Sequence, residues 1–195
     1  MMAASPRMLG SFIQGTLDAI DRHDADLGRR VRDGLRPASR EAIAGASRIA
    51  FLDLELDVEV TEILYRVAGP ERARAVLRAN LAETFTSPIL RSFITMALRL
   101  RGREPGRLLE WSSKVWGQIY RDCGSISFVP VGTSEGRFEL NGLPPVIVEH
   151  ADYVDGIAAA MSAVLDLLEV DGHTELKALD PATGRAIITA VWETE

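Results

Sequence analysis

ISFVPVGTSEGRFELN, residues 126–141, is the stretch of the chain that decides the fold class. Apolar Ile126 and Phe128 alternate with serines before a turn at 132–136, and the alternation resumes from Phe138. Alternation with a period of two is typical of strands with one buried face. Two such strands joined by a Gly-containing turn predict an antiparallel hairpin.

The remainder of the C-terminal half adds a helix and a second hairpin. A proline pair at 144–145 precedes a pattern of helical spacing that ends at Leu168, and this predicts one helix. Residues 174–180 and 185–192 read as two further strands joined by a tight turn. The predicted order is therefore ββαββ, a four-stranded antiparallel sheet with one face that the rest of the chain must cover.

The first 124 residues read as helices, because apolar side chains recur there at three- and four-residue spacing. One helix is apolar on most of its circumference and is predicted to be the central core helix. Residues 52–60 alternate apolar and acidic side chains, which favours a strand, but the apolar residues from Val60 onward continue at helical spacing. Both strand and helix therefore stay possible for this segment. We expect an extended backbone through residue 56 and a helix after it. The predicted helices lie at about residues 9–20, 27–36, 39–46, 57–68, 70–84, 88–102 (the core helix) and 105–123.

These elements predict an α+β fold, with an N-terminal helical half packed on a C-terminal ββαββ sheet. We expect a single domain over residues 1–195, with the helical half at 1–124 and the ββαββ half at 125–195. The chain is 47% hydrophobic and 26% charged, which is ordinary for a globular protein and excludes a disordered or collagen-like chain. No stretch has the roughly 20 apolar residues of a membrane span, and one cysteine favours a reducing cytoplasm.

The charge is divided unevenly along the chain. Residues 1–107 carry 17 Arg and 14 acidic residues, a balance of +3, whereas residues 108–195 carry 5 basic and 14 acidic residues, a balance of −9. The simplest interpretation is that the two surfaces attract each other within one protein or across a dimer. The overall charge of −6, without a basic stripe that contains aromatic residues, argues against a nucleic-acid partner.

No motif for catalysis or metal binding is present. His23, His150 and His173 each stand alone, so neighbouring residues cannot assemble a zinc site. Cys123 is expected at the C-terminal end of a helix, the wrong end of the helix dipole for a reactive thiolate. A buried structural cysteine is the simpler interpretation, and a thiol that contacts a ligand is the alternative. We therefore expect no enzymatic activity and no metal.

Several large apolar side chains are candidates for a ligand pocket. They fall on two predicted helices that should meet beneath the sheet, and apolar pockets often lie between such layers. The competing interpretation is an ordinary filled core. The candidate ligand-binding residues are Phe93, Met96, Trp111, Trp116, Tyr120 and Cys123.

Several blocks of sequence, spread over roughly residues 10–193, resemble a large uncharacterised paralogue family that is expanded in myxobacteria. The blocks are Asp57-Val58-Glu59-Val60-Thr61-Glu62 to Gly69-Pro70-Glu71-Arg72-Ala73, Ser87-Pro88-Ile89-Leu90, Leu98-Arg99-Leu100 through Trp111 and Trp116 to Tyr120-Arg121-Asp122-Cys123-Gly124, and the closing Leu143-Pro144-Pro145. The layout of that family is similar to a broader fold of helices followed by ββαββ. This fold includes haem-nitric-oxide-binding domains, the four-vinyl-reductase small-molecule-binding domain and TRAPP vesicle-tethering subunits.

The resemblance implies a fold that senses apolar ligands or docks partners. Its haem-binding members hold the cofactor with a histidine and a Tyr-x-Ser-x-Arg motif. In this chain Tyr120-Arg121-Asp122-Cys123-Gly124 lacks the Ser and the Arg, and no histidine falls in the helix where the ligand would sit. We therefore expect no haem and no other cofactor.

The function predicted from the sequence is a non-enzymatic cytoplasmic sensor or signalling domain that binds a small apolar ligand between helices and sheet. The alternative is a protein-interaction or dimerisation module with a filled core and no ligand. A third and weaker hypothesis is an enzyme or redox sensor that depends on Cys123.

Overall fold

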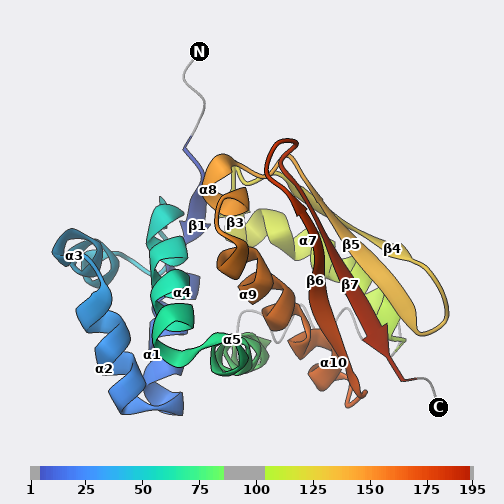
Figure 1. Ribbon diagram of the computed structural model, residues 1–195, viewed down its shortest axis with the longest axis horizontal. Coiled ribbons are helices and arrows are strands. Elements are labelled where there is room, and N and C mark those ends of the chain that lie inside the picture. The colour runs from blue at the N-terminus through green and yellow to red at the C-terminus, as the bar shows by residue number, and fades with distance from the viewer. Residues whose placement is uncertain (1–4, 86–103, 194–195) are drawn as a thin grey trace.

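The computed structural model describes residues 5–85 and 104–193 of the chain, in which helices precede a sheet (Figure 1). The predicted α+β class is confirmed. The predicted core helix at 88–102 lies outside the described residues. The helices that precede the sheet are α1 (Gly10–His23), α2 (Ala25–Gly34), α3 (Pro37–Gly45), α4 (Glu55–Ala68), α5 (Pro70–Phe85) and α7 (Pro105–Ile119).

The C-terminal sheet has four antiparallel strands in the order β4-β5-β7-β6, which confirms the two predicted hairpins. The inward side chains of the central strands β5 and β7, such as Phe138 and Ile188, are completely buried and lie opposite each other. Among the inward positions of β5 and β7, Gly136 alone lacks a side chain, and a Cβ there would lie 2.2 Å from the ring of Phe128. The strands are β4 (Ser125–Pro130), β5 (Glu135–Asn141), β6 (Gly172–Asp180) and β7 (Arg185–Trp192).

Three helices follow the first hairpin where the sequence predicted one. The second break falls at Ser162, whose hydroxyl accepts the Thr174 backbone N–H of β6 at 2.9 Å. This bond ties the helical segment to β6 at a residue whose own backbone keeps helical angles, with φ −59° and ψ −25°. The three segments are α8 (Pro145–Val148), α9 (Ala151–Met161) and α10 (Ala163–Leu167).

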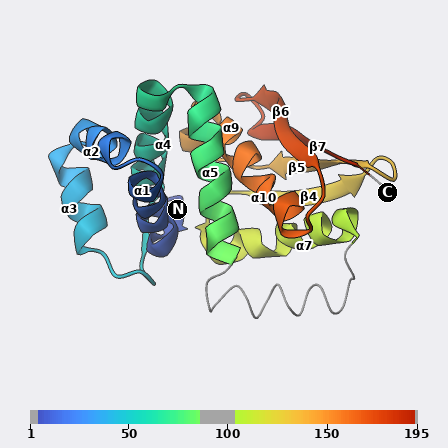
Figure 2. The same cartoon turned by 90° about the horizontal axis from the view of Figure 1, so that it is seen from below.

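One face of the sheet is covered by α9, α10 and α7, and the N-terminal helices pack behind them. Helix α5 lies between α1 and α4 on one side and α9 and α10 on the other (Figure 2). Side chains on the other face of the sheet, among them Ser127, Arg137 and Glu175, are exposed. The helices therefore pack in layers on one side of the sheet, and the other side of the sheet is exposed to solvent.

A second, small sheet was missed by the sequence analysis. It consists of β1 (Arg7–Leu9) between β2 (Phe51–Asp53) and β3 (Tyr120–Arg121), in antiparallel pairs. Strands of two or three residues are too short to show a periodicity. The helix predicted to continue to 123 ends at Ile119, because Tyr120 pairs with Met8 instead.

Helix α4 begins at Glu55, two residues before the predicted start, and the extended segment ends at Asp53 rather than at 56. Two acids in its first turn, Glu55 and Asp57, are favoured by the helix dipole. The predicted end of this helix is confirmed at Gly69, which has a φ of +79° and is followed by Pro70 at the start of α5. No helix among the described residues has the length and apolar character needed to span a membrane.

Candidate functional site

A cavity of about 170 Å³ lies among the helices, and its walls are mostly apolar. Ile126 is the one described lining residue from the four-stranded sheet, so the cavity lies between helices more than between helices and sheet, where it was predicted. Its walls come from α1, α4, α5, α7, α9 and α10, with one residue each from β1, β3 and β4. The apolar lining side chains are Met8, Phe12, Leu77, Leu81, Phe85, Leu108, Trp111, Val115, Trp116, Ile119, Tyr120, Ile126, Tyr153, Ile157, Ala160, Met161, Val164 and Leu167.

Three of the predicted pocket residues, Trp111, Trp116 and Tyr120, line this cavity. The rings of Trp116 and Tyr120 stack with centroids 4.0 Å apart and planes at 25°. The indole N–H of Trp116 is buried and has no hydrogen-bond acceptor among the described residues. Phe93 and Met96 lie outside the described residues.

Cys123 is not among the described residues that line the cavity. It follows β3 on a tight turn, between Asp122 with φ +56° and Gly124 with φ +73°, and not at a helix end as predicted. Its thiol is buried and donates to the carbonyl of Arg121 at 3.0 Å. Burial raises the pKa of the Cys123 thiol to about 11, with Asp122 adding to the effect. A thiol with this pKa is a poor nucleophile at neutral pH.

A polar corner of the cavity was not predicted. Asp57 on α4 is 5% exposed, and its Oδ2 accepts a hydrogen bond from the Tyr153 hydroxyl of α9 at 2.8 Å. The hydroxyls of Tyr153 and Tyr120 lie 3.4 Å apart, so two phenols and one carboxyl form a short chain. All three residues line the cavity.

Burial dominates the titration of this corner. It raises the pKa of Asp57 to about 6, against the opposing effect of the Tyr153 hydrogen bond. Burial, and then the nearby Asp57, raise the pKa of both phenols above the usual value for tyrosine. The phenols are therefore neutral at every ordinary pH, whereas the carboxyl changes its charge close to neutrality.

Asp57 was not among the predicted site residues, although a helix was expected from residue 57. The alternating acids at 53–59 indicate a solvated face, and for Asp57 that interpretation is wrong because the side chain is buried. On α4, Asp57 shares one side with Thr61 and Leu64, one and two turns later. The helical spacing from Val60 onward was the signal that could have placed Asp57 inside.

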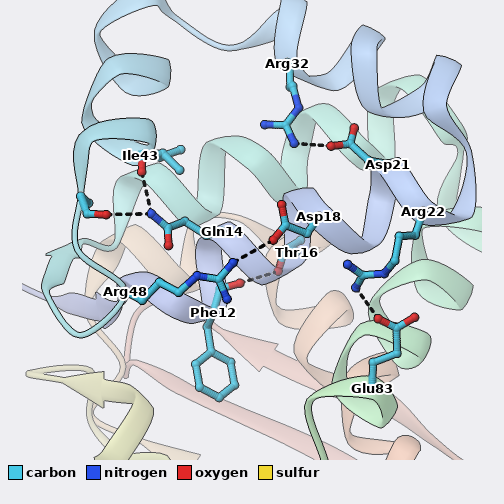
Figure 3. Close-up of polar contacts among 11 residues, drawn as sticks. Phe12, Gln14, Thr16, Asp18, Asp21, Arg22, Arg32, Ile43, Arg48 and Glu83 are labelled. Atoms are coloured by element: carbon cyan, nitrogen blue, oxygen red, sulfur yellow. Dashed lines mark hydrogen bonds and ion pairs between the residues drawn. The ribbon is translucent and has the colours of Figure 1, made fainter. Parts of the chain in front are cut away.

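A second polar group of the cavity wall joins α1 to α5. The Asn80 amide donates to the Thr16 hydroxyl at 3.0 Å, and that hydroxyl donates to the carbonyl of Phe12 at 3.1 Å. Figure 3 shows that Phe12 points away from the polar contacts made by Gln14 and Asp18 on the other side of α1. Gln14 donates to the carbonyl of Ile43 in α3 and to that of Ala46 just after this helix, so α1 is held from both sides.

Two ion pairs hold α5 against the helices that cover the sheet. Arg74 donates to both carboxylate oxygens of Asp155 at 2.7 Å, and Asp155 also accepts the Tyr65 hydroxyl at 2.7 Å. Arg78 donates to Asp166 at 2.7 Å. These pairs join the basic half of the chain to the acidic half within one molecule, one of the two arrangements predicted from the charge division.

Comparison with known proteins found neighbours in structure alone. No protein-family model matches the chain, and no curated protein matches it. An Fe(II) unliganded H-NOX protein from K. algicida has a TM-score of 0.63 at 9% identity, covering 96% of this chain and 98% of that one. An oxygen-binding H-NOX domain related to soluble guanylate cyclases has a TM-score of 0.61 at 13% identity, with 96% of each chain covered. An H-NOX structure from work on heme distortion has a TM-score of 0.61 at 11% identity, again over 96% of each chain.

At these identities the likeness shows the fold, and the predicted resemblance to the haem-nitric-oxide-binding fold is confirmed. The resemblance to a myxobacterial paralogue family stays a prediction. The prediction of no cofactor, with haem not expected, is contradicted, because the structural neighbours are H-NOX proteins characterised with Fe(II), oxygen or heme. It rested on the short motif at Tyr120 and on the absence of a histidine from the helix where the ligand would sit. Motifs do not reveal which side chains the fold brings around a cavity.

The described walls of the cavity fit haem only in part. Atoms that can coordinate iron are present in the thioethers of Met8 and Met161 and the phenols of Tyr120 and Tyr153. No histidine or cysteine belongs to the described lining, and the raised phenol pKa values disfavour a tyrosinate ligand. A cavity of about 170 Å³ is close to the roughly 150 Å³ that accepts benzene.

Proposed function

We propose that this chain is a non-catalytic sensor domain that binds a small, largely apolar molecule in the cavity between α1, α4, α5, α7 and α9. The observation that carries the proposal is the apolar cavity itself, inside a fold shared with H-NOX proteins. An apolar ligand bound against these walls would lose contact with water, which favours binding by roughly 25 cal/mol per Å² of apolar surface removed from water.

The aromatic pair gives the cavity a means of recognition beyond volume. The stacked rings of Trp116 and Tyr120 offer a flat apolar wall to a ligand. Trp111 and Trp116 also make ligand entry measurable, because indole fluorescence responds to contact with a bound molecule. We take Trp111, Trp116 and Tyr120 as ligand-contacting residues of the proposed site.

Haem is one candidate ligand, since H-NOX neighbours are characterised with it. Bound haem would supply an iron centre able to take a diatomic gas. Met8, Met161, Tyr120 and Tyr153 are the described residues that could hold it. A titration with haemin, followed by visible absorbance, distinguishes haem from a smaller apolar ligand: a sharp band at one equivalent identifies haem.

The test of the proposal is toluene binding to the wild-type chain, measured by tryptophan fluorescence and calorimetry. The Ala160→Leu substitution places extra side-chain volume in the cavity wall on α9 and is expected to abolish toluene binding. Ala151→Leu adds the same group at an exposed position of the same helix and is expected to leave binding unchanged. Failure of toluene and haemin alike to bind the wild type would refute the proposed function.

We also propose that residues 1–195 form one domain in the reducing cytoplasm. The cavity supports the single domain, because Leu77 and Ile157, on either side of residue 124, face the same space. The alternative of a dimerisation module with a filled core is weakened by this cavity and by the intramolecular Arg–Asp pairs. Sedimentation over a wide concentration range tests the alternative, which requires a stable dimer.

A further inference from the structure

We propose that the cavity selects apolar molecules that carry a protonated amine, with the carboxylate of Asp57 as the counter-charge. The inference rests on the proposed function, since it names the chemical class of ligand for the same cavity. It begins from the position of Asp57, a side chain that is 5% exposed and that lines the cavity.

Asp57 has unused hydrogen-bonding capacity. A carboxylate can accept about four hydrogen bonds, two at each oxygen. Among the described residues the Tyr153 hydroxyl is the one donor to Asp57, and it reaches Oδ2. The other oxygen, Oδ1, receives no hydrogen bond from the described chain, so a ligand that donates N–H groups would find an acceptor there.

Asp57 has no positively charged partner among the described residues, whereas two other acidic residues each pair with an arginine. Glu59, two residues later on α4, accepts from the Arg36 guanidinium and the Ser39 hydroxyl. Asp155 accepts two hydrogen bonds from Arg74. No Arg, Lys or His belongs to the described residues that line the cavity with Asp57. An ionised carboxylate buried in this way is strongly unfavourable until a cation reaches it.

The surroundings of Asp57 suit an ammonium group attached to an apolar body. Tyr120 and Trp116 present aromatic rings to the same cavity, and aromatic faces attract cations. The remaining lining is almost entirely apolar, so a hydrocarbon portion of the ligand would pack against side chains such as Leu77 and Ile157. The volume of about 170 Å³ has room for about one six-membered ring.

Three probes of nearly equal size separate charge from shape: benzylamine, benzyl alcohol and toluene. In the wild type, at a pH above the Asp57 pKa, benzylamine is expected to bind at least about tenfold more tightly than toluene, with benzyl alcohol between them. The Asp57→Asn variant keeps the shape and the acceptor for Tyr153 but removes the charge. It is expected to lose the preference for benzylamine while it still binds toluene, which also shows that its cavity is intact.

Glu55→Gln is the matched control, because it removes one acid from the same first turn of α4 at an exposed position outside the cavity. It is expected to keep the full preference for benzylamine. Equal or tighter binding of toluene by the wild type, or a benzylamine preference that survives in Asp57→Asn, would overturn the inference while the proposed function stands. Absence of binding for all three probes and haemin would refute the proposed function itself.

Discussion

The substitution Asp57→Asn is expected to stabilise the protein near neutral pH and to leave its stability almost unchanged in acid. Burial raises the pKa of Asp57 from 3.8 to about 6, so the folded protein holds this proton more tightly than the unfolded chain does. The contribution of Asp57 to the free energy of unfolding is therefore most favourable below pH 3.8. It decreases as the pH rises towards 6, and is constant above that value.

The magnitude follows from the two pKa values. Each tenfold difference in proton affinity corresponds to about 1.4 kcal/mol, so a pKa of about 6 in place of 3.8 amounts to about 3 kcal/mol at neutral pH. Tyr153 and Tyr120, the titratable groups that face the carboxyl from α9 and β3, stay neutral over this range and add no pH dependence. Asparagine carries no charge and can still accept the Tyr153 hydroxyl, so it escapes this loss of stability.

The assay is urea unfolding of the wild type and the variant at about pH 4 and about pH 7.5, in the absence of ligand. The variant should exceed the wild type by about 3 kcal/mol at the higher pH and by less than about 1 kcal/mol at the lower one. The Glu55→Gln control should show no such divergence. A difference between Asp57→Asn and wild type that is the same at both pH values would refute the assignment of Asp57 as a buried group with a raised pKa.

Three further predictions concern parts of the fold away from the cavity. Gly124→Ala should lower the free energy of unfolding by at least about 2 kcal/mol, because φ is +73° and the new Cβ would lie 2.4 Å from the Asn141 carbonyl oxygen. Gly132→Ala is the control, since nothing lies within 4 Å of its new Cβ, and it should change the free energy of unfolding little in the same urea titration. Phe138→Ala should cost about 3–5 kcal/mol by thermal unfolding, since the ring is completely buried at the centre of the sheet, and a smaller loss than about 1 kcal/mol would contradict that position. Cys123 should react with Ellman's reagent only after denaturation, and rapid reaction of the native protein would contradict its burial and its pKa of about 11.

The sequence predicted those parts of the fold in which a regular spacing of hydrophobic residues continues over many positions. The alternation on both sides of the 132–136 turn predicted the β4–β5 hairpin, and the observed register pairs Phe128 with Phe138 as that alternation requires. The predicted helix end at Gly69 and helix start at Pro70 were also confirmed. Glycine readily adopts the positive φ found after a helix, and proline has a fixed φ that suits the first helical position. Period and backbone chemistry are local properties, so one sequence is enough to reveal them.

The parts that the sequence did not predict depend on distant partners. Tyr120 leaves the helical pattern because Met8 is available to pair with it, and the helix after Pro145 breaks where Ser162 meets Thr174 of β6. Neither partner is visible from local spacing.

The site shows the same division between local and distant information. Trp111, Trp116 and Tyr120 were selected for size and helical spacing, and they do line the cavity. Asp57 and Tyr153 were not selected from the sequence, although they also line the cavity. The carboxyl lies beside the phenol only because α4 packs against α9. The ligand-binding role of all of these residues stays a prediction until the probes are tested.

The three-stranded sheet has a consequence for the order in which the protein folds. Its central strand β1 lies close to the start of the chain, yet Arg7 pairs with Arg121, so the pairing closes a loop that contains every N-terminal helix. Closing a loop of this length is entropically unfavourable before the enclosed helices are compact, and contacts of this kind slow folding. Met8 and Tyr120, which both line the cavity, are therefore expected to pair late in folding, after β3 has been synthesised. A ligand would meet a finished cavity only in the native protein, and its presence should slow unfolding more than it speeds folding.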